Sequence, residues 1–482
     1  MTPGPPLTRA FPARYVRLRV LLPNLVTYPY AMPLYRRLPS LLCILPLCLF
    51  LSACGTRDTG TSGPYAGPPC MDVLTYSQNL TSYADAAGGG KTLVSVPEQA
   101  AAAARQKEAL YRPWRLSKPA RWIEQSLAKN FNMNVSRGYT DNKEPFPRGT
   151  WDALVANSNK KAYGKDAGPA VTLRHTNLRA MPSAMRFYYR PDLPGEGYPF
   201  DYFQHTSTPP GTPVYICNVS KDGLWLLVDG PLTAGWIPAT DAARVDEAFI
   251  ERWQSPPLAA VVRDNTDIGG VTGHAGTLLP LAEAASPGLG RSLSVLYPVR
   301  ASSGKAGIAT AVIAPGAATA VPLPLSAAAV AGIGNGMMGQ AYGWGGLDGR
   351  RDCSALTRDL FAPFGIHLPR NSANQAKAGR TVDLSFLSNA EKERAIIARN
   401  APFRTLVWLK GHIGVYIGAH EGKAMLFHNM WGLRTKDAKG GCDNRAVVGK
   451  AVITTLRPGA ERPDLCTPGS FLDRIEKAAV LP

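Results

Sequence analysis

The segment from Arg351 to Ser372, RDCSALTRDLFAPFGIHLPRNS, places one cysteine between an aspartate and a serine, just before a helical pattern. Four glycines precede it, at positions 343, 345, 346 and 349. They allow the backbone to approach Cys353 closely and irregularly. Apolar residues between Ser354 and Phe361 recur with helical spacing. Cys353 would therefore lie at a helix N-terminus, where the helix dipole favours thiolate over thiol, and it is either a structural thiol or a nucleophile.

A nucleophilic cysteine needs a base that also returns a proton to the leaving amine, and histidine usually serves. Three of the seven histidines fall in GHIGVYIGAHEGKAMLFHNMWG, whose two alternating halves predict a β-hairpin with the five-residue loop GAHEG. Pairing Ile417 with Lys423 places His412 directly opposite His428, with Cβ atoms about 5 Å apart on one face. His428 would then hold the tautomer of His412, whereas His420 would lie exposed at the loop tip.

Evenly spaced histidines can also bind metal. No His-Glu-x-x-His or Cys-x-x-Cys spacing accompanies these three, so we predict no metal site and no cofactor.

The stretch MPLYRRLPSLLCILPLCLFLSACG resembles an export signal, with two arginines before eleven apolar residues from Leu41 to Leu51. Eleven residues are too few to span a bilayer. Leu-Ser-Ala-Cys at its end resembles the lipobox of bacterial lipoproteins, which implies lipidation of Cys54. Because the signal is complete from Met32 onward, we expect translation to start there. We therefore expect export and a lipid anchor on the periplasmic face, with the outer membrane favoured by Gly55.

The charge is strongly positive. Residues 1–53 contain six arginines and no acidic residue, so their removal lowers the formal charge from +18 to about +12. Basic residues are scattered, without an arginine-rich run or a nucleic-acid motif. This pattern fits an anionic wall or membrane surface and predicts no nucleic-acid partner.

Five of the eight cysteines remain after Cys54: Cys70, Cys217, Cys353, Cys442 and Cys466. An odd number in an oxidising compartment leaves at least one thiol unpaired. Cys442 and Cys466 are close in sequence, and we pair them first. Cys353 is the best candidate for the unpaired thiol, and together with the glycines, the histidine pair and the export signal this favours a secreted cysteine hydrolase.

Composition changes along the chain predict several domains. Helical patterns come first, then short alternating segments such as TPVYICNV, KDGLWLLVDG and AGWIPAT, which predict small antiparallel barrels. A helix capped by Ser326 should lead into the last domain. The predicted parts are a signal and upstream extension (1–53), a lipidated cysteine and tether (54–69), a helical domain (70–165), a first barrel (166–255), a second barrel (256–325) and a catalytic domain (326–482).

The motifs YGWGGLDGRRDCSAL, GIHLPRNSANQAKAG and GHIGVYIG with LFHN resemble the NlpC-type cell-wall cysteine peptidases, and the barrel segments resemble bacterial SH3-like domains. The resemblance implies an α+β papain-like domain that cleaves the γ-D-glutamyl to diamino-acid bond of peptidoglycan stem peptides. It implies Cys353 as nucleophile, His412 as general base and acid, and His428 as the third polar residue. Tyr342 would lie near the oxyanion site, together with the backbone N–H of Cys353.

In relatives with such barrels, residues like Asp352, Ser354 and Ser372 bind the free amino end of the peptide, and a barrel wall restricts substrates to those beginning with L-Ala. Asp352 alone also fits a helix N-cap. The chain departs from the family pattern in having RTLVWLKG before His412, and sixteen residues between His412 and His428. Two other functions stay open, a hydrolase of intact cross-linked wall anchored by its barrels and a non-catalytic wall-binding lipoprotein.

Overall fold

The computed structural model describes residues 67–482. The predicted signal segment, the start at Met32, the lipidated Cys54 and most of the predicted tether lie outside the described residues. Within residues 67–482, no helix combines the length and the apolar character that crossing a bilayer requires.

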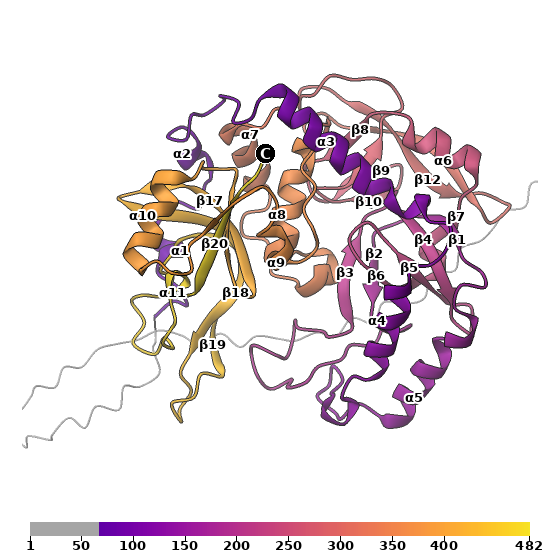
Figure 1. The fold of residues 1–482 in the computed structure, drawn as a ribbon, viewed down its shortest axis with the longest axis horizontal. Helices are drawn as coiled ribbons and strands as arrows, with labels where there is room; N and C mark the ends of the chain where they lie inside the picture. The colour runs from indigo at the N-terminus through magenta and orange to yellow at the C-terminus, as the bar shows by residue number, and fades with distance from the viewer. Residues whose placement is uncertain (1–66) are drawn as a thin grey trace, which may run out of the picture. The chain divides into compact units, whose positions relative to one another are not determined.

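The described chain begins with a helical region (Figure 1). Its helices are α1 (Asp72–Thr75), α2 (Thr81–Ala84), α3 (Val96–Tyr111), α4 (Arg121–Phe131) and α5 (Arg148–Asn157), with short 3-10 turns at Arg112–Arg115, Val135–Arg137 and Lys160–Ala162. Helix α3 begins where the Ser95 side chain accepts a hydrogen bond from the Glu98 N–H, and its alanine-rich sequence favours helix. Gln106 of α3 donates to the Ala362 carbonyl at 2.9 Å, which ties this helix to the C-terminal part of the chain.

Seven antiparallel strands form the first sheet, in the order β3-β2-β6-β5-β4-β1-β7. The strands are β1 (Gly168–Thr172), β2 (Thr176–Arg179), β3 (Gln204–Thr208), β4 (Pro213–Val219), β5 (Trp225–Asp229), β6 (Ala234–Pro238) and β7 (Ala242–Arg244). Strands β4, β5 and β6 lie within the three alternating segments from which the barrel was predicted. Helix α4 packs on this sheet through Ile123 and Leu127, which share a cluster with Trp236.

A second β region follows α6 (Glu247–Gln254) and consists of smaller sheets, with the orders β11-β8-β14, β12-β13 and β10-β9. Its strands are β8 (Leu258–Val261), β9 (Thr266–Ile268), β10 (Val271–Gly273), β11 (Leu278–Pro280), β12 (Leu293–Arg300), β13 (Ala306–Ile313) and β14 (Ala318–Ala320). Phe249 and Trp253 of α6 are buried in the same apolar cluster as Val295 and Ile313 of this region.

The C-terminal domain is a six-stranded sheet, in the order β15-β20-β16-β17-β18-β19, with helices packed against it. The strands are β15 (Arg380–Asp383), β16 (Thr405–Leu409), β17 (His412–His420), β18 (Lys423–Thr435), β19 (Asn444–Thr455) and β20 (Ile475–Val480). The helices are α7 (Ala327–Asn335), α8 (Cys353–Phe361), α9 (Ser372–Gln375), α10 (Asn389–Arg399) and α11 (Phe471–Arg474), with 3-10 segments at Trp344–Gly349 and Ala362–Phe364. Ser326 caps α7 as predicted, because its side chain accepts from the Ala329 N–H. The chain therefore has the predicted α+β domain preceded by β-rich and helical parts.

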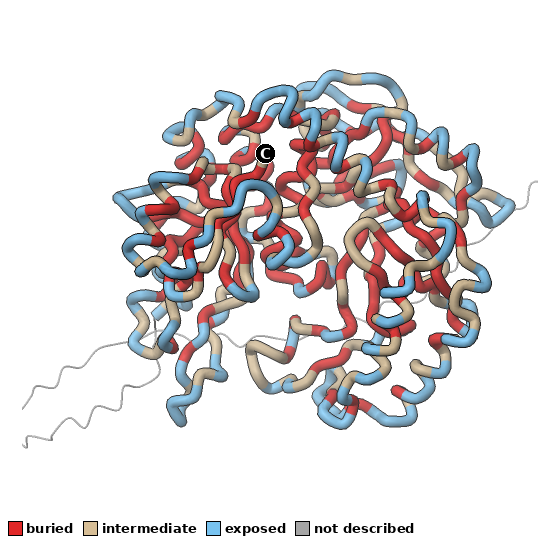
Figure 2. The backbone as a smooth tube through the Cα atoms, in the orientation of Figure 1, coloured by how far each residue is buried: buried red, intermediate tan, exposed pale blue. Residues whose placement is uncertain are grey.

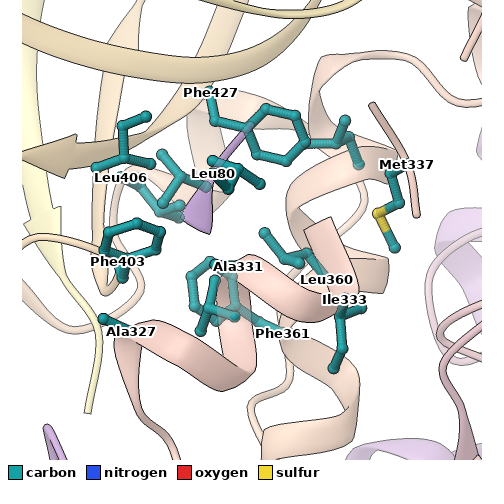
Figure 3. Close-up of a cluster of buried hydrophobic side chains, with 14 of the residues drawn as sticks. Leu80, Ala327, Ala331, Ile333, Met337, Leu360, Phe361, Phe403, Leu406 and Phe427 are labelled. Carbon is teal, nitrogen blue, oxygen red and sulfur yellow. The ribbon is translucent and has the colours of Figure 1, made fainter. Parts of the chain in front are cut away.

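The core of this domain lies between helices α7 and α8 and the sheet (Figures 2 and 3). Leu360 and Phe361 of α8 meet Leu406 of β16 and Phe427 of β18, and all four side chains are at most 1% exposed. Helix α8 is thus held against the central strands, and its first residue is placed at the start of β17.

The predicted hairpin exists, but its predicted register and loop are wrong. Val415 pairs with Phe427 and His420 with Lys423, with a bulge between Tyr416 and Gly418. The turn is only Glu421 and Gly422, both at positive φ (50° and 75°), which is the geometry that two-residue hairpins favour. The pairing near Val415 is shifted by two residues from the predicted one. Because side chains alternate with a period of two, His412 and His428 still share a face.

Cys442 and Cys466 form a disulfide, which confirms the predicted pairing. Among residues 67–482 the free cysteines are Cys70, Cys217 and Cys353, all buried.

Candidate active site

Cys353 is the first residue of α8 and is only 7% exposed. Asp352 caps the helix, because its Oδ1 accepts from the Ala355 N–H at 2.8 Å. The backbone N–H of Ile413 interacts with the Cys353 sulfur. Since Ile413 follows His412 directly, the sulfur lies against the start of the strand that carries the predicted base.

His412 and His428 are joined by a 2.7 Å hydrogen bond between Nε2 of His412 and Nδ1 of His428. Nε2 of His428 lies 3.0 Å from Oγ1 of Thr454, and that hydroxyl donates its proton to the Thr455 carbonyl at 2.7 Å. With its proton committed, Thr454 can only accept from His428, so His428 carries its proton on Nε2. His412 must then donate from Nε2, which leaves its Nδ1 unprotonated. This nitrogen is the one that can accept the proton of a thiol.

Two further residues, Gly414 and Phe471, hold the two histidines in this arrangement. A Cβ at Gly414 would lie 2.8 Å from the His428 Cβ and 2.8 Å from the Leu426 Cγ, so only glycine fits there. Phe471 of α11 packs its ring against both imidazoles, with ring centroids 5.2 Å from His412 and 5.5 Å from His428. Both rings are therefore held by packing as well as by hydrogen bonds.

Burial favours the neutral forms of Cys353 and His412. Burial and then the Asp352 charge raise the pKa of Cys353 to about 12, against a smaller lowering by the Ile413 N–H. Burial and then the Arg474 charge lower the pKa of His412 to about 3. Desolvation therefore opposes the thiolate that the helix N-terminus and the Ile413 N–H favour.

Tyr342 lies in the same site and is 7% exposed. Burial, followed by the charges of Cys353 and Asp352, raises its pKa well above the ordinary value. Its ring centroid lies 5.9 Å from that of Trp431 and 6.2 Å from that of Phe200. Phe200 precedes β3, so an aromatic cluster joins the C-terminal domain to the first sheet close to Cys353.

Asp352 and Ser354 are brought together by Arg370, a residue that the sequence analysis did not single out. Arg370 donates to Oδ2 of Asp352 at 2.6 Å and to Oγ of Ser354 at 2.9 Å. Oδ2 also accepts from the Gly345 N–H at 3.1 Å, and Oδ1 from the Ser354 hydroxyl at 3.0 Å. Although burial opposes ionisation of Asp352, the charge and hydrogen bonds of Arg370 lower its pKa.

These contacts occupy both carboxylate oxygens of Asp352, so the structure favours the N-cap role over direct binding of a substrate amine. Ser372 does not join this network, and its hydroxyl instead accepts from Nε1 of Trp408 at 3.3 Å.

Arg351 was also missed, although it directly precedes Asp352. It is 2% exposed and donates to both oxygens of Asp264, at 2.7 and 2.8 Å, and to Asp359 at 2.7 Å. Asp264 belongs to the second β region, so this ion pair fixes that region beside Cys353. Among residues 67–482, no cluster of three or more His, Cys, Asp or Glu side chains could hold a metal ion.

Three family models match the chain. Residues 339–449 match the NlpC/P60 family, residues 186–238 an SH3 domain of the SH3b1 type, and residues 41–163 the N-terminal NLPC_P60 stabilising domain. Residues 339–449 thus form an NlpC/P60-type domain, which the chain combines with an SH3-like domain and an N-terminal stabilising domain.

Several proteins that are similar to this chain are described as NlpC or NlpC/P60 proteins. A probable endopeptidase NlpC homolog from Haemophilus influenzae is 34% identical over 97 residues, which are 19% of this chain and 45% of that relative's length. The solved structure of an NlpC/P60 endopeptidase from Photobacterium damselae subsp. piscicida has a TM-score of 0.75 and 25% identity, covering 84% of this chain and 97% of that one. An NlpC/P60 family protein from Bacillus cereus ATCC 10987 gives a TM-score of 0.42 at 20% identity, over 65% of this chain and all of that one.

Proposed function

We propose that this protein is a cysteine endopeptidase that hydrolyses the γ-D-glutamyl to diaminopimelate bond of peptidoglycan stem peptides. The observation that carries the proposal is the hydrogen-bonded chain from His412 through His428 to Thr454, which leaves Nδ1 of His412 free to accept a proton, while the next residue, Ile413, contacts the Cys353 sulfur through its N–H. The endopeptidase names of the relatives from Haemophilus influenzae and Photobacterium damselae support it.

The uncharged resting pair defines the order of proton transfers. Nδ1 of His412 takes the thiol proton as the Cys353 sulfur attacks the γ-carbonyl carbon, because the isolated thiolate is disfavoured by burial. The backbone N–H of Cys353 and the Tyr342 side of the site would stabilise the oxyanion. His412 then protonates the leaving amine, and the thioester is hydrolysed by a water whose proton returns through the same nitrogen.

The first sheet forms a wall beside this site, which supports small soluble peptides as substrates. A Cβ at Gly346 would lie 2.2 Å from the Ser207 hydroxyl, and Arg370 donates to Thr206 at 2.7 Å. Trp431 Nε1 donates to the Pro194 carbonyl. These contacts hold the first sheet close to Cys353 and leave little room for a large substrate. They therefore favour peptides with a free N-terminal L-Ala over cross-linked wall.

The test compares three substrates, namely L-Ala-γ-D-Glu-diaminopimelate, its N-acetylated form and intact sacculi. We expect cleavage of the free-amine peptide alone, and a loss of at least about a thousandfold in Cys353→Ala. Cys217→Ala, the same change at a buried thiol of the first sheet, is the matched control and should stay active. Cleavage of sacculi would replace the small-peptide proposal with a wall hydrolase, and full activity of Cys353→Ala would refute the thiol mechanism.

We further propose that the chain is exported and anchored to a membrane by lipid on Cys54. Labelling of expressing cells with a radioactive fatty acid should mark the wild-type chain but not Cys54→Ser. Equal labelling of both chains would contradict the proposed anchor.

A further inference from the structure

A second pocket lies where the first sheet, the second β region, α3 and α8 meet. It encloses about 110 Å³ and its lining includes neither Cys353, His412 nor His428. It brings together His175, His274 and His367, which come from three different parts of the chain. The mechanism above uses none of these three residues.

Several polar atoms that line this pocket have no hydrogen-bond partner. Within residues 67–482, both ring nitrogens of His175, Nδ1 of His274 and Nη1 of Arg358 are buried without one. Nδ1 of His274 lies 3.6 Å from Oδ1 of Asp264 and helps to lower the pKa of that carboxyl, so His175 and Arg358 are the groups that lack a partner. The two imidazole rings face each other edge to face, with centroids 5.0 Å apart. Buried donors without acceptors are costly, so they indicate that something else pairs with them.

The charges around the pocket favour an anion. The carboxylates are already paired, since Asp359 accepts from Arg351 at 2.7 Å and from Arg358 at 2.8 Å, and Asp264 accepts from Arg351. Arg350 lines the pocket as a further cation. Burial and then His274 lower the pKa of His175 to about 4, so its ring is neutral near pH 7 and offers one N–H donor. The free donors are therefore Nη1 of Arg358 and one ring nitrogen of His175, and Oε1 of Gln106 is an unpaired acceptor in the same lining.

The rest of the wall is apolar and consists of Leu110, Leu178, Leu232, Leu278, Ile366 and Leu368. A benzene-sized molecule occupies a cavity of about 150 Å³, so this pocket suits a body of roughly four carbon atoms.

We propose that this pocket binds a short-chain carboxylate, with its oxygens accepting hydrogen bonds from Arg358 and His175 and its alkyl chain against the leucines. The ligand would join three parts of the chain behind helix α8. Because it binds the folded chain only, it stabilises the protein by an amount that rises with the logarithm of its concentration above the dissociation constant.

Three probes of equal size, with inorganic phosphate as a fourth, separate recognition of the charged group from recognition of the alkyl chain. Butyrate, 1-butanol and butylamine are titrated into the full chain by calorimetry, with the melting temperature as a second readout. We expect butyrate to bind and to raise the melting temperature, and butanol to bind about tenfold or more weakly, because it lacks the charged hydrogen bonds. Equal binding of butanol would mean a merely apolar cavity, and binding of inorganic phosphate but not butyrate, or of no probe, would also overturn the proposal.

Variants locate the site. Arg358→Gln and His175→Phe should each weaken butyrate binding by about tenfold or more. The matched control is Arg291→Gln, at an exposed arginine of the second β region, which should bind butyrate like the wild type. Should either pocket variant fail to fold, ring ¹⁵N spectra of the wild-type histidines answer the same question. Butyrate should shift the His175 and His274 resonances, and unchanged resonances at saturating butyrate would refute the site.

Discussion

At the scale of single residues, Thr454 decides which nitrogen of His412 is free. Its hydroxyl accepts from His428 only because it donates to the Thr455 carbonyl. Thr454→Val removes that acceptor, so His428 loses the contact that fixes its tautomer. We expect kcat to fall about 10- to 100-fold while KM changes little. Thr454→Ser keeps the hydroxyl and should retain most of the activity, whereas a Thr454→Val enzyme with wild-type kcat would disprove the positioning role.

The raised pKa of Cys353 makes a second prediction at this scale. A buried thiol at about 12 is almost wholly protonated near pH 7. Alkylation of Cys353 by iodoacetamide should therefore be slow at neutral pH and should accelerate as pH rises beyond the ordinary cysteine value of about 8.5. The rate is measured by mass spectrometry of the modified peptide between pH 5 and 11. A plateau already reached below pH 7 would show a thiolate–imidazolium pair instead.

Sequence reasoning located the residues with distinctive chemistry but not their supports. Cys353, His412 and His428 stand out because cysteine and histidine are uncommon and their spacing is informative. Thr454 and Arg370 have no such signal, since threonine and arginine occur throughout the chain and these two act through partners far away in sequence. Arg370, for example, donates hydrogen bonds to Asp352, Ser354 and Thr206, and only the folded chain brings these three residues together.

At the scale of elements, the close approach of β17 to β18 depends on Gly414. Gly414→Ala puts a methyl group 2.8 Å from the Cβ of His428. We expect a loss of about 1–3 kcal/mol in stability and a marked loss of activity, because the strands must separate. Urea unfolding and peptide cleavage measure the two effects. The matched control is Gly332→Ala in α7, where an added Cβ meets nothing within 4 Å, and which should be neutral or slightly stabilising.

The same hairpin shows what pattern reasoning can and cannot fix. Alternation determined the face of each residue, and an even error in register preserves faces, so the histidine pair was predicted correctly from a wrong pairing. The turn at Glu421 and Gly422 and the bulge at Tyr416 depend on backbone angles, which alternation does not report. A glutamate at positive φ has no strong sequence signature.

At the scale of the whole molecule, buried neutral histidines predict acid sensitivity. Burial lowers the pKa values of His175 to about 4 and of His412 to about 3, and that of His428 well below its ordinary value. In the unfolded chain these groups protonate near pH 6.5, so the unfolded state binds more protons below that pH and stability falls as pH drops. Each contributes up to about 1.4 kcal/mol per pH unit.

Urea midpoints at pH 7, 6 and 5 test this dependence. Burial also lowers the pKa of His205 and His367. We expect the midpoint to fall steadily, and His175→Phe, which removes one of these five groups, to flatten the slope by about a fifth. A midpoint that does not change from pH 7 to pH 5 would contradict neutral burial of these rings.

How the parts of the chain pack together was beyond prediction. The ion pair of Arg351 with Asp264 joins residues 87 positions apart. No sequence pattern around either residue predicts that the two will pair. Such contacts follow from the shapes of the assembled domains. Breaking a buried pair of this kind leaves an uncompensated charge, so the geometry of the site depends on the second β region as well as on the catalytic domain.

Oxidising conditions favour the Cys442–Cys466 disulfide but threaten the free thiol of Cys353. Disulfides persist where oxidants are available, and oxidants attack thiolates far faster than thiols. Because burial keeps Cys353 protonated until substrate arrives, its sulfur is poorly reactive toward peroxide and toward exchange with the Cys442–Cys466 bond. The raised pKa of Cys353 therefore also slows the oxidation of its sulfur.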